Sequence, residues 1–212
     1  MRDMKHILST IAAVVLVGCS PANSNKSGVT FLKNKETEKR IPKELLKFLT
    51  EDQSVGMVNN KILFFNFDGK KINDQLLSTL LQFDELEVLI LDSTEITDTG
   101  LITLAKLSKL KALWLDFNNI TEKGLDELQA LENLIDLDIE NINIADNNGL
   151  KCLGNFKALK SLEIINNGIG DECIESIIKI KNLEDLWIIE GNNFSRQGLD
   201  KLRNELPNCD IY

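Results

Sequence analysis

Four acidic residues recur along the chain at a constant interval of 24 residues, and they are the first candidates for chemistry. They are Asp68, Asp92, Asp116 and Glu140. If a repeating fold stacks them at strand spacing, about 4.8 Å apart, their charges repel and raise their pKa values. Such a row favours a basic partner or a divalent cation such as calcium, although the spacing matches no EF-hand loop. The alternative is a solvated row that nearby lysines partly balance.

Aromatic and apolar side chains form a second set of candidates, because exposed aromatic residues are frequent anchors of protein interfaces. This set contains both tryptophans of the chain, one phenylalanine and one isoleucine: Trp114, Trp187, Phe64 and Ile90. Further acidic residues recur at neighbouring positions: Asp136, Asp138, Glu163 and Asp185. Together with the acidic row, these residues are predicted to bind a partner.

Histidine chemistry is excluded from the mature protein. The one histidine, His6, lies in an N-terminal segment that we expect to be removed. The domain therefore holds no Ser–His or Cys–His nucleophile pair and no His-ligated zinc site. A formal net charge of -9 argues against nucleic acid as a partner, because phosphate contacts need an excess of Lys and Arg. No cofactor other than a covalent lipid is expected.

A leucine-rich pattern repeats along about 70% of the chain and explains how these residues are positioned. Each unit reads L-x-x-L-x-L-x-x-x-x-I with apolar substitutions, and the units begin at positions 62, 86, 110, 134, 159 and 183. The pattern resembles the leucine-rich-repeat family, and the I-T-x-x-G-L segments at 96–101 and 120–125 resemble its subclasses with a true helix, the ribonuclease-inhibitor-like and cysteine-containing-like ones. The family's ladder asparagine is kept only as Asn118 and Asn167, so a continuous ladder is not expected.

The period predicts an α/β solenoid over residues 62–212, with six repeats and a truncated C-terminal strand. Leu-x-Leu spacing indicates a strand with one buried face, and the later apolar stripe indicates a helix on the convex side. Units of this kind stack into a curved parallel sheet on the concave side. Gly100, Gly124 and Gly149 fall where the helices begin, so we expect tight turns there. Leu206-x-x-Cys209-x-Ile211 matches the strand frame once more.

The candidate residues occupy the strand positions between the buried leucines, and their side chains should point to the concave surface. We therefore expect Phe64, Ile90, Trp114 and Trp187 to be exposed there. The alternative is partial burial against neighbouring side chains or against the segment that precedes the domain.

The N-terminus is typical of a bacterial lipoprotein. Residues 1–18 combine a basic segment with an apolar run too short to span a membrane, and residues 16–19 read LVGC, which resembles a lipobox. The resemblance implies lipidation of Cys19 and cleavage before it. An ordinary signal peptide with a chance cysteine is the alternative. Residues 19–40 are expected to be a flexible tether, and residues 41–61 a helical cap whose helix begins at Pro42.

Three cysteines remain in the domain: Cys152, Cys173 and Cys209. Cys173 and Cys209 are expected to be small core residues. A bridge between Cys152 and Cys173 is the alternative in an oxidising compartment.

The sequence favours a non-enzymatic recognition module that is exported and lipid-anchored to the cell envelope, in the outer membrane if the host has two membranes. Its expected partner is a protein or peptide that is basic or carries exposed apolar residues. A structural envelope lipoprotein without a single specific ligand is the alternative. An enzyme such as a glycosidase with a carboxylate pair is not expected, because units of 24 or 25 residues leave no loop long enough to close a pocket.

Overall fold

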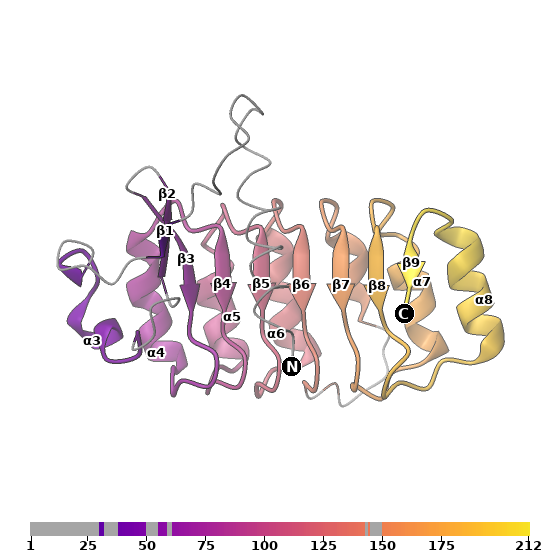
Figure 1. Ribbon diagram of the computed structural model, residues 1–212. Helices are drawn as coiled ribbons and strands as arrows, with labels where there is room; N and C mark the ends of the chain where they lie inside the picture. Colours follow the sequence, from indigo (N-terminus) through magenta and orange to yellow (C-terminus); the bar gives the residue numbers. More distant parts are fainter. Residues whose placement is uncertain (1–29, 32–37, 50–54, 59–60, 143, 145–149) are drawn as a thin grey trace, which may run out of the picture.

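A single sheet runs the length of the molecule, and helices cover one of its faces. The computed structural model describes residues 30–31, 38–49, 55–58, 61–142, 144 and 150–212. The strands follow the chain in order, from β1 to β9 (Figure 1). Pairing is antiparallel from β1 to β3 and parallel from β3 to β9. The α/β solenoid predicted from the repeat period is confirmed.

The strands are short, and most of them hold three residues. Their bounds are β1 Thr30–Phe31, β2 Val55–Val58, β3 Lys61–Asn66, β4 Val88–Ile90, β5 Ala112–Trp114, β6 Asp136–Asp138, β7 Ser161–Glu163, β8 Asp185–Trp187 and β9 Asp210–Ile211. The helices are α3 Lys43–Leu46, α4 Asp74–Leu77, α5 Asp98–Leu104, α6 Glu122–Glu127, α7 Ile174–Ile177 and α8 Arg196–Glu205. The 3-10 helices are η1 Ser78–Gln82, η2 Leu128–Ala130, η3 Lys151–Asn155 and η4 Asp171–Cys173.

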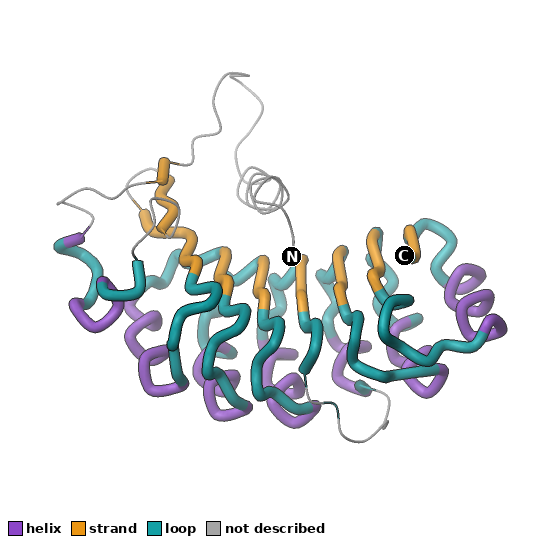
Figure 2. Tube along the Cα trace, turned by 60° about the horizontal axis from the view of Figure 1, so that its bottom comes forward, coloured by secondary structure: helices purple, strands orange, loops and turns teal. Residues whose placement is uncertain are grey.

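The parallel register places equivalent residues of successive repeats side by side. Leu89 pairs with Leu113, and Leu113 pairs with Leu137. All three leucines are fully buried between the sheet and the helices. Figure 2 shows the strands lining one side of a curved band and the helices lining the other. The apolar positions of each repeat thus form a continuous core along the band.

Two of the three glycines expected at tight turns have a different role. Gly100 and Gly124 lie inside the first turns of α5 and α6. A Cβ atom at Gly124 would lie 2.4 Å from Oδ1 and 2.9 Å from Cα of Asp98 in the preceding repeat. The close approach of the neighbouring repeat, and not a tight turn, therefore excludes a side chain. Gly149 lies outside the described residues.

An asparagine ladder runs along part of the loops that follow the strands. The Nδ2 of Asn118 donates to the carbonyl oxygens of Leu91 and Leu115 at 2.7 and 3.0 Å. Asn167 repeats the bond across repeats, and Asn192 takes the same role one position later than the repeat frame places it. The ladder therefore extends beyond the two asparagines identified from the sequence.

The N-terminal end of the sheet contains more strand than expected. The helix expected after Pro42 is α3, but β2 lies within the segment expected to be a helical cap. Residues 30 and 31 belong to the segment expected to be a tether, and they pair with β2 as strand β1. Thr and Phe favour strands, and β2 offers them an edge with unpaired backbone groups.

No helix in the described part of the chain is long and apolar enough to cross a membrane.

Candidate functional site

The concave face of the sheet carries one row of side chains that runs through all the parallel strands. The register places these residues side by side: Asn66, Ile90, Trp114, Asp138, Glu163 and Trp187. Tyr212, directly after β9, continues the row beside Trp187. A second row lies two residues earlier in each strand: Phe64, Val88, Ala112, Asp136, Ser161, Asp185 and Asp210. Eight of the twelve residues predicted to bind a partner belong to these two rows, and the other four are Asp68, Asp92, Asp116 and Glu140.

The expected exposure of three apolar residues on this face is wrong. Phe64 and Ile90 are 1% exposed, and Trp114 is 3% exposed. Phe64 is the register partner of Val88, and Ile90 is the register partner of Trp114, so these side chains pack against large apolar neighbours along the sheet. Phe64 also lies against β2, since a Cβ atom at Gly56 would come within 3.1 Å of its ring. For these three residues the structure instead shows burial, which the sequence analysis gave as the alternative.

Three acidic residues at the centre of the face are also buried. They are Asp136, Asp138 and Glu163. The indole Nε1 of Trp114 donates to Oδ2 of Asp136 at 3.4 Å, which joins the two concave rows across strands β5 and β6. These carboxylates therefore belong to the packed part of the concave face, and they do not form the open acidic surface that the sequence predicts.

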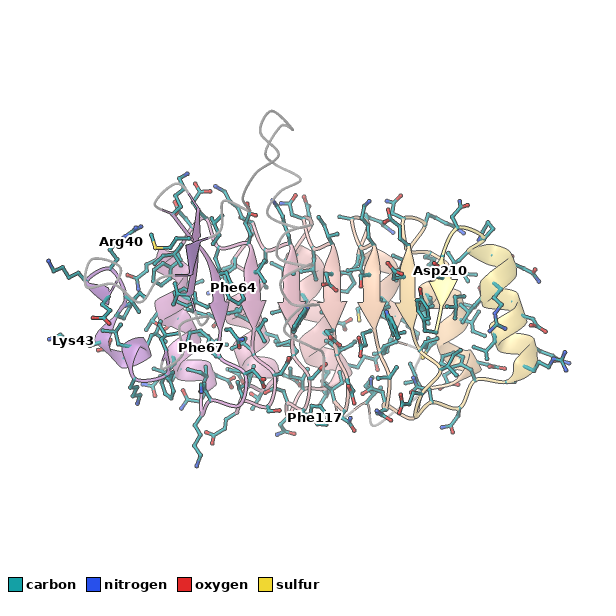
Figure 3. All side chains as sticks on the ribbon, viewed as in Figure 1. Arg40, Lys43, Phe64, Phe67, Phe117 and Asp210 are labelled. Carbon is teal, nitrogen blue, oxygen red and sulfur yellow. The ribbon has the colours of Figure 1, made fainter. Side chains whose placement is uncertain are left out.

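The C-terminal end of the concave face is open, as expected for Trp187. The rings of Trp187 and Tyr212 stack with centroids 4.1 Å apart and planes 18° apart. Their side chains are 37% and 44% exposed, and the neighbouring Ile189 is 42% exposed. Asp185 is half-buried beside them and Asp210 is exposed. Figure 3 labels Asp210 on the last strand of the sheet. Exposed aromatic rings and carboxylates thus share one patch, which we call the C-terminal patch.

Tyr212 was missed because the sequence frame gave the last strand a different register. That frame places Cys209 and Ile211 at the two leucine positions. In the structure Ile211, and not Cys209, pairs with Leu186 of β8. The register of β9 therefore differs by two residues from the expected one, and Tyr212 lies beside Trp187. Cys209 is consequently only half-buried, and it packs against the outside of the core instead of filling a leucine position inside it. The signal that could have located Tyr212 is the alternation of Asp210, Ile211 and Tyr212, which matches Asp185, Leu186 and Trp187.

Asp92, Asp116 and Glu140, three members of the predicted acidic row, form hydrogen bonds to the following repeat. Oδ1 of Asp92 accepts a hydrogen bond from the backbone N–H of Asp116 at 3.0 Å, and Oδ1 of Asp116 accepts one from Glu140 at 2.7 Å. Asp92, Asp116 and Glu140 are half-buried, and Asp68 is exposed. Within the described residues, no three His, Cys, Asp or Glu side chains gather in a way that could hold a metal ion. These carboxylates therefore help to join the repeats. They also place negative charge at the carboxyl ends of the parallel strands.

The three cysteines of the domain are free thiols, so the structure does not contain the alternative bridge between Cys152 and Cys173. Both residues are buried. Burial raises the pKa of each thiol to about 12, and nearby carboxylates add to the shift. A thiol with so high a pKa is a poor nucleophile at neutral pH. These residues therefore read as core residues.

Cys19, the expected lipidation site, lies outside the described residues.

The chain is similar to several proteins of solved structure. No protein-family model matches the chain, and no curated protein matches it. An internalin C2 from Listeria monocytogenes is 30% identical over 70% of this chain, with a TM-score of 0.55. An internalin F from the same organism is 27% identical over 67% of this chain, with a TM-score of 0.54. A leucine-rich-repeat protein of Leptospira interrogans is 23% identical over 63% of this chain, with a TM-score of 0.48.

The chain spans only part of each matched structure: 58% of the internalin C2 structure, 38% of the internalin F structure and 38% of the Leptospira structure. The repeat of 24 or 25 residues, the parallel ladder and the buried leucines agree with the likeness to the two internalin structures. The chain therefore has the leucine-rich-repeat solenoid fold.

Proposed function

We propose that this protein is a non-enzymatic recognition module that binds another protein through the concave face of its solenoid. The observation that carries the proposal is the C-terminal patch, where Trp187 and Tyr212 stack in the open beside Asp185 and Asp210. Aromatic side chains supply large contact areas at low cost in conformational entropy and are enriched in binding hot spots. Carboxylates beside them favour a basic partner. The likeness to internalins supports a surface built for binding.

The location that we propose is the bacterial cell envelope, with the protein exported and held to the membrane through a lipid on Cys19. The support is the sequence alone, where a basic and then apolar segment precedes LVGC at residues 16–19. A protein with several acyl chains stays anchored, because each buried CH2 group adds about 0.8 kcal/mol.

Crosslinking in intact cells tests the recognition role. Cells producing the full chain are crosslinked, the protein is recovered with an antibody against it, and captured proteins are identified by mass spectrometry. The test variant is Trp187→Ala with Tyr212→Ala. The matched control is Ile102→Ala, which removes a side chain that is 49% exposed on helix α5. We expect the wild type and the control to capture a basic partner protein, and we expect the test variant to lose it.

Two other outcomes contradict the proposal. If the wild type, the control and the test variant all capture the same protein, binding occurs away from the C-terminal patch. Absence of any enriched protein favours a structural envelope lipoprotein without a single ligand.

Labelling with a radioactive fatty acid tests the anchor. We expect wild-type protein to carry the label and to sediment with membranes, and Cys19→Ser to lose both properties. Cys209→Ser is the control and should keep both, because Cys209 lies in the folded domain. Label that persists in Cys19→Ser overturns the proposed lipidation site.

A further inference from the structure

Phe117 has a backbone conformation that a bulky residue rarely adopts. Its φ angle is +55°, in the left-handed region. The same turn recurs after other strands, where the residues with positive φ are Gly69, Ser93, Asn141, Asn166 and Gly191. Gly and Asn tolerate this region, whereas for a bulky side chain it costs roughly 1–2 kcal/mol. The fold thus favours a small or polar residue at this position, and the chain carries phenylalanine there.

Hydrogen bonds between repeats hold this turn in place. The backbone N–H of Phe117 donates to the carbonyl oxygen of Glu140 at 2.9 Å. The equivalent bond one repeat earlier runs from Ser93 to the carbonyl oxygen of Asp116 at 2.8 Å. Because the ladder fixes the backbone on both sides, the turn keeps its conformation whatever side chain it bears.

The Phe117 ring gains little from burial in return. Its side chain is 55% exposed, the highest value among the large hydrophobic residues in the described part of the chain. Figure 3 shows Phe117 at the edge where the strands end, away from Asp210 in the C-terminal patch. An exposed aromatic ring in a turn that favours Gly or Asn adds little to the stability of the fold, and strained residues of this kind are concentrated at binding sites.

The charge around Phe117 determines what can cover it. Asp92, Asp116 and Glu140 lie along the same edge, in the repeat before Phe117, in its own repeat and in the next one. Residues 61–212 hold 27 acidic and 15 basic side chains. Repulsion therefore disfavours both a second copy of this chain and an anionic lipid surface. Arginine fits this surface, because its guanidinium group stacks on aromatic rings and pairs with carboxylates.

We propose that Phe117 is the anchor of a second docking surface, on the edge where the strands end, and that it receives an arginine side chain from a basic segment of a partner protein. This surface is separate from the C-terminal patch, and the inference does not depend on the proposed role of that patch.

The test uses the full chain, labelled hexa-arginine and hexa-lysine as probes, and fluorescence anisotropy at low and high salt. The variant is Phe117→Asn, which introduces the residue found at the equivalent positions 141 and 166. We expect hexa-arginine to bind the wild type more tightly than hexa-lysine, and Phe117→Asn to weaken hexa-arginine binding about 2- to 5-fold, as for an exposed cation–π contact. Ile102→Asn is the matched control and should bind like the wild type.

Two further measurements separate binding from folding and from the C-terminal patch. Phe117→Asn should raise the midpoint of thermal unfolding by about 2–4 °C, because it relieves the left-handed strain. The loss of hexa-arginine binding should recur when Phe117→Asn is added to Trp187→Ala with Tyr212→Ala. Unchanged binding in Phe117→Asn overturns the proposal. A lower unfolding midpoint also overturns it, because Phe117 would then support the fold.

Discussion

The carboxylate of Asp98 is bound by Thr121 of the next repeat through two hydrogen bonds. Oδ1 accepts from the backbone N–H of Thr121 at 2.7 Å, and Oδ2 accepts from its hydroxyl at 2.7 Å. Thr121 is itself the N-cap of α6, and its hydroxyl accepts a bond from the N–H of Lys123. Each carboxylate of this kind therefore fixes the start of the helix in the following repeat.

The same arrangement recurs at two other pairs of repeats. Asp74 binds the N–H and hydroxyl of Thr97 at 2.9 and 2.6 Å. Asp171 binds Ser195 in the same way, and these bonds lower the pKa of the Asp171 carboxyl below its usual value.

Removal of the Asp98 carboxylate should destabilise the solenoid. We expect Asp98→Ala to lower the free energy of unfolding by about 1.5–3 kcal/mol, because it removes two hydrogen bonds to a charged group. Urea unfolding followed by circular dichroism measures the change. Asp200→Ala removes an exposed carboxylate that forms a surface ion pair with Arg203, and it should change stability by less than about 0.5 kcal/mol. Equal effects of the two substitutions would show that the bond to Thr121 contributes nothing.

Gly124→Ala should destabilise the protein, although alanine normally favours helices over glycine. The new Cβ atom would lie 2.9 Å from the backbone Cα of Asp98, so rotation of the Asp98 side chain cannot remove the clash. We expect a loss of about 1–3 kcal/mol in urea unfolding, the usual range for overpacking. Lys123→Ala, at an exposed position of the same helix, is the control and should be nearly neutral.

A double substitution separates the two causes of that clash. Asp98→Ala in the Gly124→Ala background should not restore stability, because the Cα atom remains. Recovery to the level of Asp98→Ala alone would show that the side chain is the obstacle and the backbone is not.

The repeat period is sufficient to predict the fold because each unit makes the same contacts. Leu113 and its equivalents recur at a fixed interval, so the sequence locates nearly every parallel strand and the buried face. The roles of Gly100 and Gly124 could not be read from the sequence, because the atoms that exclude a side chain belong to the preceding repeat.

The binding surface was harder to predict than the fold. Alternation assigns Phe64, Ile90 and Trp114 correctly to the concave face, but it says nothing about what covers that face. The stacking of Tyr212 on Trp187 depends on the register of β9, and a shift of two residues keeps the same alternation of faces. The positions of the apolar residues alone do not distinguish the two registers, whereas the match of residues 210–212 to residues 185–187 favours the observed one.

Glu85 should contribute to stability in a defined range of acidic pH. Lys109 and Lys61 both donate to its carboxylate, at 2.8 and 2.7 Å, and lower its pKa from 4.5 to about 2. Because the folded-state pKa lies below the unfolded value, the contribution is complete above about pH 4.5 and is lost as the pH falls towards 2. Glu85→Gln should therefore lose less stability than the wild type between pH 5 and pH 3.

Urea midpoints at the two pH values measure this difference, and 1 M NaCl should reduce it because the three side chains are accessible to solvent. The same pH dependence in Glu85→Gln and the wild type would contradict the role of Glu85.

Cys152 and Cys173 should be unreactive in the folded protein. Burial raises both thiol pKa values to about 12, so almost no thiolate exists at pH 8, and both residues are buried in the core. Iodoacetamide at pH 8 should therefore leave both residues unmodified in native buffer and modify both in urea, as read by mass spectrometry of peptides.

Cys209 provides the internal comparison, because it is half-buried and its thiol pKa is raised only to about 11. It should react before the other two in native buffer. Failure of Cys152 and Cys173 to react even in urea, with reaction restored by a reductant, would reveal a bridge between them and contradict the free thiols of the structure.

Since folding raises all three pKa values, the folded state retains protons that the unfolded state loses, and stability should fall as the pH rises above about 9.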